Sequence, residues 1–454
     1  MAVSLGQKLF GGQKITLMGL GLLGRGVGDA KFLAASGAEL IVTDRKTAIE
    51  LRASVEQLKK FSKIKFVFGE HRPQDFRGRD LIIRGAAVPP DSPYLLEAEK
   101  QKIPITMSTA LFAKQALQIG VTLIGITGTR GKSTTTHLVF EVLKRAAGRA
   151  RLVFLGGNIR NVATLPFLNK IKPGDQAVLE LDSWQLQGFG AEKISPQLAL
   201  FTNFFPDHLN YYHGDLASYL ADKAHIFLNQ KADDYLIIGE QAAPLIQKTY
   251  GAKIKSRMII ASPKDLPIDW QFKLPGEHNR YNLALALVAG RALNISTTVI
   301  RPVLENFTGV GGRLELIRER GGVKIYNDTT ATTPEATLAG LRALATKKKV
   351  ILIMGGADKN LDLAILLDNL PHYCREIILL PGTGTDKLLA AGGNKLKTKL
   401  VKNLAAAVKL ALAGARAGNT VLFSPAFSSF GPPPGGFKNE FDRGDQFNKL
   451  IKEY

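Results

Sequence analysis

Short apolar runs recur along the chain, and stretches of helical length separate them. Runs that are apolar at successive positions are typical of strands buried on both faces of a parallel sheet. We predict strands at 15–20, 39–43, 80–83, 121–127, 176–181, 198–203, 235–238, 323–327, 350–354, 376–380 and 420–424. Helices are predicted between them, among others at 132–147, 216–229, 279–293 and 334–343. Such alternation predicts α/β domains with mostly parallel sheets.

The length of 454 residues suggests about three domains at ~150 residues each. We place the first domain at 1–110, because a short strand after Pro104 ends the first run of alternating elements. The second domain is placed at 111–311 and the third at 312–454. The glycine-rich break 309–312 between them predicts a hinge.

Composition excludes several classes of protein. The chain is 45% hydrophobic and 22% charged, which is ordinary for a globular protein and excludes a disordered or fibrous one. No apolar stretch approaches the ~18 residues of a membrane-spanning helix, and the first residues do not resemble a signal peptide. Cys374 is the single cysteine, which excludes an internal disulfide and cysteine-based zinc or iron–sulfur sites. We therefore expect a cytoplasmic protein.

The net charge of +21 does not decide the function by itself. It fits nucleic acid, an anionic membrane surface, acidic small substrates or a generally basic proteome. No nucleic-acid-binding signature accompanies it. We expect no nucleic-acid partner and no membrane insertion, and nothing in the sequence requires more than a monomer.

A glycine-rich turn follows the first predicted strand. Gly19, Gly21 and Gly24 form G-x-G-x-x-G, and Asp44 lies at the end of the next strand. In dinucleotide-binding folds such glycines let the backbone approach a pyrophosphate, and the acidic residue binds a ribose. Arg45 adds a cation beside it. The same turn also occurs without a ligand, and a nicotinamide-dependent oxidoreductase is a further, weaker interpretation.

A second phosphate motif follows the strand at 121–127. Residues 127–135 read T-G-T-R-G-K-S-T-T and precede a predicted helix. Backbone N–H groups and the helix N-terminus would hold the phosphates, Lys132 would reach the β and γ oxygens, and Ser133 would bind Mg²⁺. The spacing departs from the strict P-loop by one position, because Ile126 stands where the first glycine is expected. The chain thus carries two separate candidate phosphate sites.

The stretch 125–135, G-I-T-G-T-R-G-K-S-T-T, resembles the ATP loop of the Mur ligase family. Further motifs similar to those of the family follow in order: G-G-N-I at 156–159, E-L-D-S-W-Q-L at 180–186, N-F-F-P-D-H at 203–208, G-E-H-N-R-Y-N-L-A at 276–284, R-L-E at 313–315, N-D-T-T-A-T at 327–332, S-P-A at 424–426 and F-K-N-E-F at 437–441. The resemblance covers essentially the whole chain. The C-terminal motifs are most similar to the branch that adds D-glutamate to UDP-N-acetylmuramoyl-L-alanine.

This resemblance implies three domains: a Rossmann-like UDP-binding domain, a central P-loop ATPase-type domain and a Rossmann-like C-terminal domain that binds the amino acid. It also implies ATP-driven amide formation. ATP phosphorylates the terminal carboxylate of UDP-N-acetylmuramoyl-L-alanine, the amine of glutamate attacks the acyl phosphate, and phosphate leaves. Because two anions must meet, cations are required. The implied cofactors are ATP and two Mg²⁺ ions.

The family's functional residues are carried over onto matching positions. The implied catalytic residues are Lys132, Glu180, His208 and Lys223. The implied magnesium ligands are Ser133, Glu180, His208 and a carbamylated Lys223. ATP would contact Gly128, Thr129, Gly131, Lys132, Ser133, Thr134, Asn279, Asn282, Arg313 and Asp328. The UDP-substrate would contact Gly21, Leu22, Leu23, Asp44, Arg45 and Asn158. Glutamate would contact Thr332, Lys359, Ser429 and Phe437.

Ordinary structural explanations remain open for several of these residues. His208 could cap a helix or pack in the core, and Lys223 could be a surface lysine. Asn279 and Asn282 share a helix face and could simply pack there. Arg313 and Asp328 come from the third domain, so we expect them to reach the nucleotide only when that domain closes.

Two departures from the family fall on the amino-acid side. Thr330 replaces the family's lysine, and a Pro-rich insert occupies 431–436. They leave L-glutamate open as the substrate instead of D-glutamate. A catalytically silent nucleotide-binding homologue is a second alternative. It predicts loss of the four implied catalytic residues, all of which are present.

Overall fold

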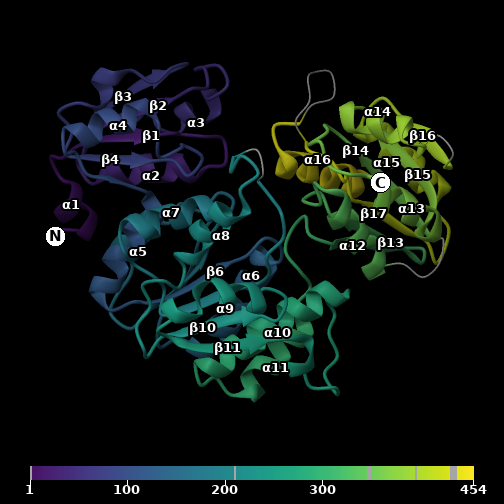
Figure 1. Cartoon of the computed structure of the whole chain (residues 1–454). Helices are drawn as coiled ribbons and strands as arrows, with labels where there is room; N and C mark the ends of the chain where they lie inside the picture. The colour runs from purple at the N-terminus through teal and green to yellow at the C-terminus, as the bar shows by residue number, and fades with distance from the viewer. Residues whose placement is uncertain (1–2, 209–210, 345–348, 394–395, 430–436) are drawn as a thin grey trace. The chain divides into compact units, whose positions relative to one another are not determined.

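The computed structural model describes residues 3–208, 211–344, 349–393, 396–429 and 437–454. The Pro-rich segment 431–436 therefore lies outside the described residues. Three mostly parallel sheets, of five, six and six strands, alternate with helices (Figure 1), which confirms the predicted α/β fold class. The chain divides into two compact units. The first consists of Met1–Ile268 and Tyr281–Leu304, and the second consists of Asp269–Arg280 and Glu305–Tyr454.

The first sheet has the strand order β3-β2-β1-β4-β5. Its strands are β1 (Lys14–Met18), β2 (Glu39–Asp44), β3 (Ile64–Phe68), β4 (Leu81–Arg84) and β5 (Ile105–Thr106), all parallel. Its helices are α1 (Leu5–Phe10), α2 (Arg25–Ala35), α3 (Arg52–Glu56) and α4 (Pro93–Lys100). The strand order reverses between β1 and β4, where open parallel sheets bind ligands.

The second sheet belongs to the same compact unit and has the order β11-β10-β9-β6-β8-β7. Its strands are β6 (Thr122–Thr127), β7 (Val153–Gly157), β8 (Gln176–Glu180), β9 (Leu198–Phe201), β10 (Tyr235–Gly239) and β11 (Arg257–Ala261). The accompanying helices are α5 (Ser108–Ile119), α6 (Lys132–Ala147), α7 (Ser183–Ala191), α8 (Leu216–Ala224), α9 (Ala243–Tyr250), α10 (Glu277–Ala292) and α11 (Thr297–Asn306). A continuous apolar cluster joins this sheet to the first one.

The third sheet has the order β12-β13-β17-β14-β15-β16. Its strands are β12 (Glu315–Arg320), β13 (Val323–Asn327), β14 (Val350–Gly355), β15 (Cys374–Leu380), β16 (Thr398–Leu400) and β17 (Thr420–Phe423), and β12 alone among them runs antiparallel to its neighbour. Its helices are α12 (Pro334–Leu344), α13 (Ala364–Tyr373), α14 (Thr383–Ala390), α15 (Leu404–Gly414) and α16 (Glu440–Glu453). Residues of β14 alternate between two apolar clusters, so both faces of this sheet are buried.

The element boundaries correct the sequence predictions at a few places. The helix predicted at 216–229 ends at Ala224, where the chain turns through His225. Strands β3, β7, β11, β12 and β16 were not predicted, and each lies at the edge of its sheet. Each sheet lies within one of the three predicted domain ranges. The domain boundaries near 110 and 311 stay predictions.

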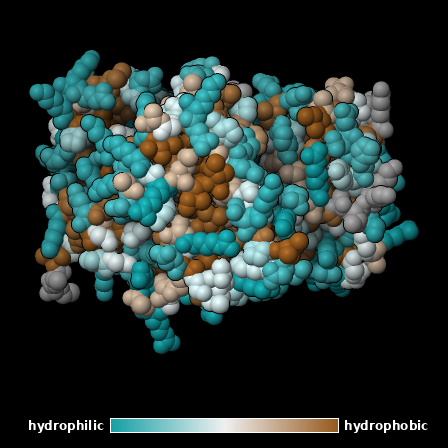
Figure 2. All heavy atoms as spheres, turned by 60° about the horizontal axis from the view of Figure 1, so that its bottom comes forward, coloured by the Kyte–Doolittle hydropathy of each residue, from teal (hydrophilic) through white to brown (hydrophobic). Residues whose placement is uncertain are grey.

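Hydrophilic side chains cover most of the face in Figure 2, with hydrophobic groups gathered in separate areas between them. Within the described part of the chain, no helix combines the length and apolar character needed to cross a bilayer.

Candidate active site

The loop between β6 and α6 has the geometry of a phosphate cradle. Gly128 and Gly131 adopt φ values of 137° and 82°, which L-residues with a side chain rarely take. A Cβ atom on Gly128 would lie 1.9 Å from Thr202 Oγ1, and one on Gly131 would lie 2.3 Å from Asn282 Oδ1. Both glycines are therefore required, and Lys132 begins α6 directly after the second one.

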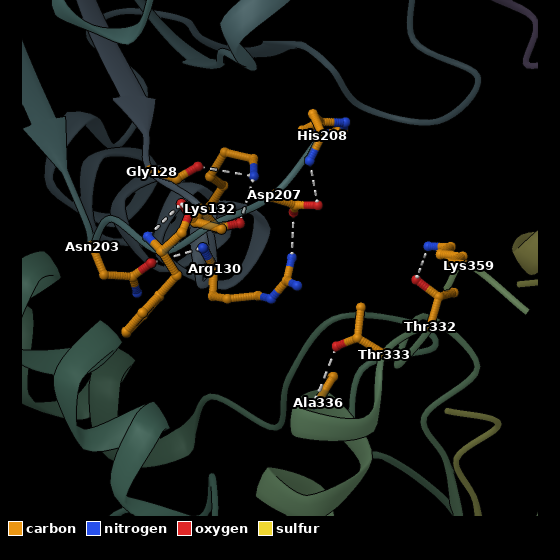
Figure 3. Close-up of polar contacts among 12 residues, drawn as sticks. Gly128, Arg130, Lys132, Asn203, Asp207, His208, Thr332, Thr333, Ala336 and Lys359 are labelled. Carbon is orange, nitrogen blue, oxygen red and sulfur yellow. Dashed lines mark hydrogen bonds and ion pairs between the residues drawn. The ribbon is translucent and has the colours of Figure 1, made fainter. Parts of the chain in front are cut away.

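The amine of Lys132 folds back over this loop. Its Nζ donates to the carbonyl oxygens of Gly128 at 3.1 Å and Thr129 at 3.0 Å (Figure 3). Ser133 and Thr134 follow in the first turn of α6 and are buried. The cation and the helix N-terminus thus lie at one loop, an arrangement that favours an anion.

Residues after β9 hold the loop in place. Thr202 Oγ1 donates to the carbonyl of Arg130 at 2.6 Å, and the Arg130 N–H donates to Asn203 Oδ1 at 2.8 Å. The Arg130 guanidinium pairs with Asp207 at 2.7 Å (Figure 3). Burial raises the pKa of Asp207, but Arg130 and His208 outweigh it and hold the pKa below its usual value. The N-F-F-P-D-H motif therefore has a structural role in shaping the phosphate loop.

Lys223 reaches the same loop from α8. Its side chain is 1% exposed, and its Nζ donates to the Gly128 carbonyl at 2.8 Å. The amine also lies 4.8 Å from the ring centroid of Tyr219. Burial, together with the charge of Lys132, lowers the pKa of Lys223 well below its usual value. The surface-lysine interpretation is excluded.

Glu180 ends β8 beside the phosphate loop, because Ile126 of β6 lies opposite it in the register. It is 3% exposed, and its Oε1 accepts a hydrogen bond from Asn158 Nδ2 at 3.4 Å. Among the described residues, its buried Oε2 has no hydrogen-bond partner. An unpartnered buried carboxylate oxygen is costly unless a cation meets it.

These donors fit Mg²⁺, which prefers carboxylate and hydroxyl oxygens and keeps several waters. Glu180 supplies the carboxylate, and Ser133 supplies a hydroxyl at the start of α6. In the described ranges, no group of three or more His, Cys, Asp or Glu side chains could hold a metal by itself.

His208 lies against aromatic side chains. Its ring centroid is 4.9 Å from that of Trp184 and 6.0 Å from that of Tyr219. Burial lowers the pKa of His208 below its usual value, although Asp207 opposes the shift. The ring is therefore neutral near pH 7, which is the form that binds metals.

The glycine-rich turn of the first sheet is held by Asp44. Its Oδ2 accepts from the N–H groups of Leu20 and Gly21, each at 2.9 Å, and its Oδ1 accepts from Lys46 N–H at 2.9 Å. Asp44 is 7% exposed, so its first role is to close the turn. A ribose contact for Asp44 stays a prediction. Leu22 and Arg45 are exposed at the turn, and Leu23 is half-buried.

The two asparagines of α10, Asn279 and Asn282, belong to different compact units. Asn282 accepts from Thr135 Oγ1 at 3.3 Å and belongs to the first compact unit, beside Gly131. Asn279 donates to the Pro275 carbonyl at 2.7 Å and belongs to the second unit. Asn282 therefore shapes the phosphate loop, whereas nucleotide binding by Asn279 stays a prediction.

The second unit holds the remaining predicted residues. Asp328 accepts from Leu314 N–H at 3.1 Å and Ser424 Oγ at 2.8 Å. Burial raises its pKa to about 7, although these bonds and Arg313 oppose the rise. Nucleotide contacts of Arg313 and Asp328 stay predictions.

Of the four residues predicted to bind glutamate, Lys359 and Thr332 are in direct contact. Lys359 Nζ donates to Thr332 Oγ1 at 3.0 Å (Figure 3). Ser429 Oγ is buried and, within the described ranges, has no hydrogen-bond partner. Phe437 packs on the apolar cluster between the sheet and α15 and α16. Thr330, which replaces the family's lysine, bonds the Gly312 carbonyl through its Oγ1 at 3.0 Å.

Two arginines that were not among the predicted site residues join separate segments of the fold. Arg443 is fully buried, and its guanidinium donates to the carbonyls of Thr329 at 2.9 Å and Phe427 at 3.3 Å, joining two loops of the second unit. Arg25 donates to Asn158 Oδ1 at 2.5 Å. Arg443 belongs, with Gly444, to the C-terminal motif that resembles the family's, whereas nothing in the sequence distinguished Arg25.

Strand β6, the glycine loop and α6 with Lys132 define a P-loop-type nucleotide-binding protein of the α/β class. Two family models match the chain, the Mur ligase middle domain over residues 126–290 and the Mur ligase glutamate ligase domain over residues 312–427. A relative from Roseiflexus sp. (strain RS-1), named UDP-N-acetylmuramoylalanine–D-glutamate ligase, is 34% identical and covers 98% of this chain and 99% of its own. A relative of the same name from Borreliella afzelii (strain PKo) is 34% identical with 96% coverage of both chains. The chain belongs to the Mur ligase family.

Solved structures support the same fold. The UDP-N-acetylmuramate–alanine ligase MurC of Thermotoga maritima superimposes with a TM-score of 0.63 at 19% identity, covering 97% of this chain and 99% of its own. The MurF ligase of the same organism, in complex with ADP, gives a TM-score of 0.56 at 17% identity and covers 99% and 97%. Mur ligases are ATP-dependent, in accordance with the phosphate loop.

Proposed function

We propose that this protein joins D-glutamate to the terminal carboxylate of UDP-N-acetylmuramoyl-L-alanine, with hydrolysis of ATP to ADP and phosphate, in the cytoplasmic synthesis of peptidoglycan precursors. The observation that carries the proposal is the placement of two groups beside the phosphate loop. Lys132 begins α6 directly after this loop, and Glu180 ends the neighbouring strand β8 with a buried Oε2 that has no hydrogen-bond partner among the described residues. The full-length relatives named for this reaction support the choice of substrates.

The chemistry has two steps. A carboxylate oxygen of the UDP-substrate forms a bond to the γ-phosphorus of ATP, and the bond from that phosphorus to the bridging oxygen breaks to release ADP. The glutamate amine then forms a C–N bond at the acyl carbon, the C–O bond to phosphate breaks, and the amine loses a proton. Both steps bring anions together, so positioned cations and N–H dipoles lower the barrier.

Lys132 and the first turn of α6 are suited to the phosphates. The Lys132 ammonium uses the Gly128 and Thr129 carbonyls as acceptors. Exchanging these carbonyls for β and γ phosphate oxygens gives the ammonium a more strongly charged partner. Gly128, Thr129, Gly131, Ser133 and Thr134 would supply the surrounding backbone and hydroxyl donors.

Magnesium would be held by Ser133 and Glu180, and a second ion by His208 and a carbamylated Lys223. Bound magnesium would neutralise phosphate charge and orient the reacting oxygens. The carbamate forms when the neutral amine of Lys223 attacks carbon dioxide and releases one proton. Burial supports this step, because it lowers the pKa of Lys223 and so favours the neutral amine that the step requires.

Separate observations support the predicted binding sites for the UDP group and for glutamate. The glycine turn with Gly21, Leu22 and Leu23 suits the UDP group, with Arg45 and Asn158 as polar partners and Asp44 holding the turn. Lys359, Thr332, Ser429 and Phe437 suit the glutamate, with the Lys359 ammonium opposite a carboxylate. We expect the protein to act as a monomer, which size-exclusion chromatography with light scattering tests.

Isotope transfer tests the proposed mechanism. UDP-N-acetylmuramoyl-L-alanine labelled with ¹⁸O in its terminal carboxylate should transfer one ¹⁸O atom to the phosphate released during ligation. Formation of ADP without glutamate measures the first step alone, because phosphate leaves only in the second step. Ligation without label in the phosphate would exclude the acyl phosphate, and no phosphate release at all would favour the silent nucleotide-binding homologue.

A further inference from the structure

The glycine turn of the first sheet is packed against the loop that follows β7. The Asn161 N–H donates to the Leu23 carbonyl at 3.0 Å. A Cβ atom on Gly24 would lie 2.9 Å from Asn161 Oδ1, and one on Gly28 would lie 2.4 Å from the Cβ of Ala163. The candidate UDP-binding turn therefore has a close-fitting contact with the second sheet of the same compact unit.

Arg25 lies at the centre of this contact. It is the first residue of α2, directly after the turn, and its guanidinium donates to Asn158 Oδ1 at 2.5 Å. Asn158 in turn donates its backbone N–H to the Glu180 carbonyl at 2.7 Å and its side-chain amide to Glu180 Oε1 at 3.4 Å. A short polar chain thus connects the substrate turn with the carboxylate beside the phosphate loop.

The hydrogen bond from Arg25 fixes how the Asn158 amide is turned. A guanidinium only donates, so the atom facing Arg25 must be the amide oxygen. The amide nitrogen then necessarily faces Glu180. The amide nitrogen donates to Glu180 Oε1, whereas Glu180 Oε2 has no hydrogen-bond partner among the described residues. Without Arg25, the Asn158 amide could rotate and withdraw this donor.

We infer that Arg25 is a positioning residue that acts through Asn158 to orient the Glu180 carboxylate for a divalent cation, and that it links the UDP-binding turn to this cation site. The inference rests on the proposed function. Groups that hydrogen-bond to metal ligands commonly change metal affinity or activity by about 10- to 100-fold when removed. An anionic substrate at the turn would lie next to Arg25 and would therefore affect the same chain of contacts.

The test compares Arg25→Met, which removes the donors, with Arg25→Lys, which keeps the charge. Lys31→Met is the matched control, because Lys31 lies on the same helix and donates to Gln57 Oε1 at 3.1 Å rather than to Asn158. Binding of Mn²⁺ is measured by electron paramagnetic resonance, with a non-hydrolysable ATP analogue present and without turnover. The Mg²⁺ concentration at half-maximal rate, kcat and the KM for ATP are measured in parallel.

Arg25→Met should weaken Mn²⁺ binding and raise the half-saturating Mg²⁺ concentration by about 10-fold, with the KM for ATP changed less than Mg²⁺ dependence. Arg25→Lys should lie between this variant and wild type, and Lys31→Met should match wild type. The double variant Arg25→Met with Asn158→Ala should bind Mn²⁺ as Asn158→Ala alone does, because the two residues act in series.

Unchanged Mn²⁺ affinity in folded Arg25→Met would overturn the inference, and so would additive effects in the double variant. The thermal unfolding midpoint of each variant identifies a purely structural loss. Failure of the proposed function is distinguishable, because wild type would then release no phosphate with the UDP-substrate, whereas Mn²⁺ binding would still report on Arg25.

Discussion

The amine of Lys223 lies 2.8 Å from the carbonyl oxygen of Gly128, although 95 residues separate them in the sequence. Lys132 donates to the same carbonyl at 3.1 Å. Two lysine amines therefore share one acceptor, and the like charge of one disfavours the charged form of the other. Lys223 is the buried member of the pair, and its pKa is well below the usual value.

Carbamylation of Lys223 is the first prediction. Wild-type protein supplied with ¹³C-bicarbonate should give a carbamate signal in ¹³C NMR spectra, and removal of carbon dioxide should slow phosphate release. Lys223→Arg should give neither the signal nor the dependence, because a guanidinium stays protonated. A bicarbonate-independent rate in wild type would contradict the prediction.

Lys132→Met should reduce the ligation rate by about 10²- to 10³-fold, as expected for loss of one charge that stabilises the transition state. Lys144→Met on the same helix is the control, since Lys144 lies in the last turn of α6, is 63% exposed and forms an ion pair with Glu141. Steady-state kinetics with saturating ATP measure both variants. Equal rates would show that Lys132 has no part in the chemistry.

Gly128→Ala should disrupt the phosphate loop. The new methyl group would overlap Thr202 Oγ1 at 1.9 Å and crowd the backbone of Asn203, so we expect a loss of stability of about 3 kcal/mol or more. Gly148→Ala is the control, because Gly148 also has a positive φ, but a Cβ atom added there would have no heavy atom of the described residues beyond its chain neighbours within 4 Å. It should cost about 1–2 kcal/mol. Chemical denaturation measures the free energy of unfolding of both variants. Similar losses of stability in the two would contradict the steric argument.

Asp29 makes stability depend on pH. It lies on α2, is 4% exposed, and its Oδ1 has no hydrogen-bond partner among the described residues. Burial raises its pKa from 3.8 to about 7, although Ser108, Arg25 and Leu165 oppose the rise. Between these two values the folded state holds a proton that the unfolded state has lost. This group therefore destabilises the fold increasingly from pH 4 to 7 and by a constant amount above pH 7.

Asp29→Asn should remove this dependence, since the amide stays neutral. Its stability relative to wild type should rise by up to about 1.4 kcal/mol per pH unit between the two pKa values and then level off. Denaturation midpoints from pH 4.5 to 8.5 measure the difference. Both proteins retain Asp328, whose pKa is also raised to about 7, so its contribution cancels. Parallel curves would show that Asp29 does not titrate in this range.

The sequence predicted the interior strands of the sheets and missed edge strands. Interior strands such as β14 are buried on both faces and read as continuous apolar runs, V-I-L-I-M in this case. Edge strands carry exposed polar positions, as in E-L-I-R-E-R of β12 and T-K-L of β16, and therefore lack this pattern. The helix at 216–229 was predicted too long because apolar residues continue through the turns after Ala224.

The candidate site was predictable where a motif identifies the residue. The P-loop glycines and Lys132 follow from strand, loop and helix alone. The burial of Lys223 and the bond between Arg25 and Asn158 depend on contacts over 95 and 133 residues, which no local pattern contains. Asp44 illustrates a different limit, because its carboxylate closes the turn that the motif assigned to a ligand.

The most direct test of the central claim is phosphate release from ATP and Mg²⁺ with UDP-N-acetylmuramoyl-L-alanine, compared between D-glutamate and L-glutamate in the presence of bicarbonate. The account predicts release and a ligated product with D-glutamate only, which would mean that Thr330, bonded to Gly312, is compatible with that substrate. Release with L-glutamate only, or with neither enantiomer, would contradict it.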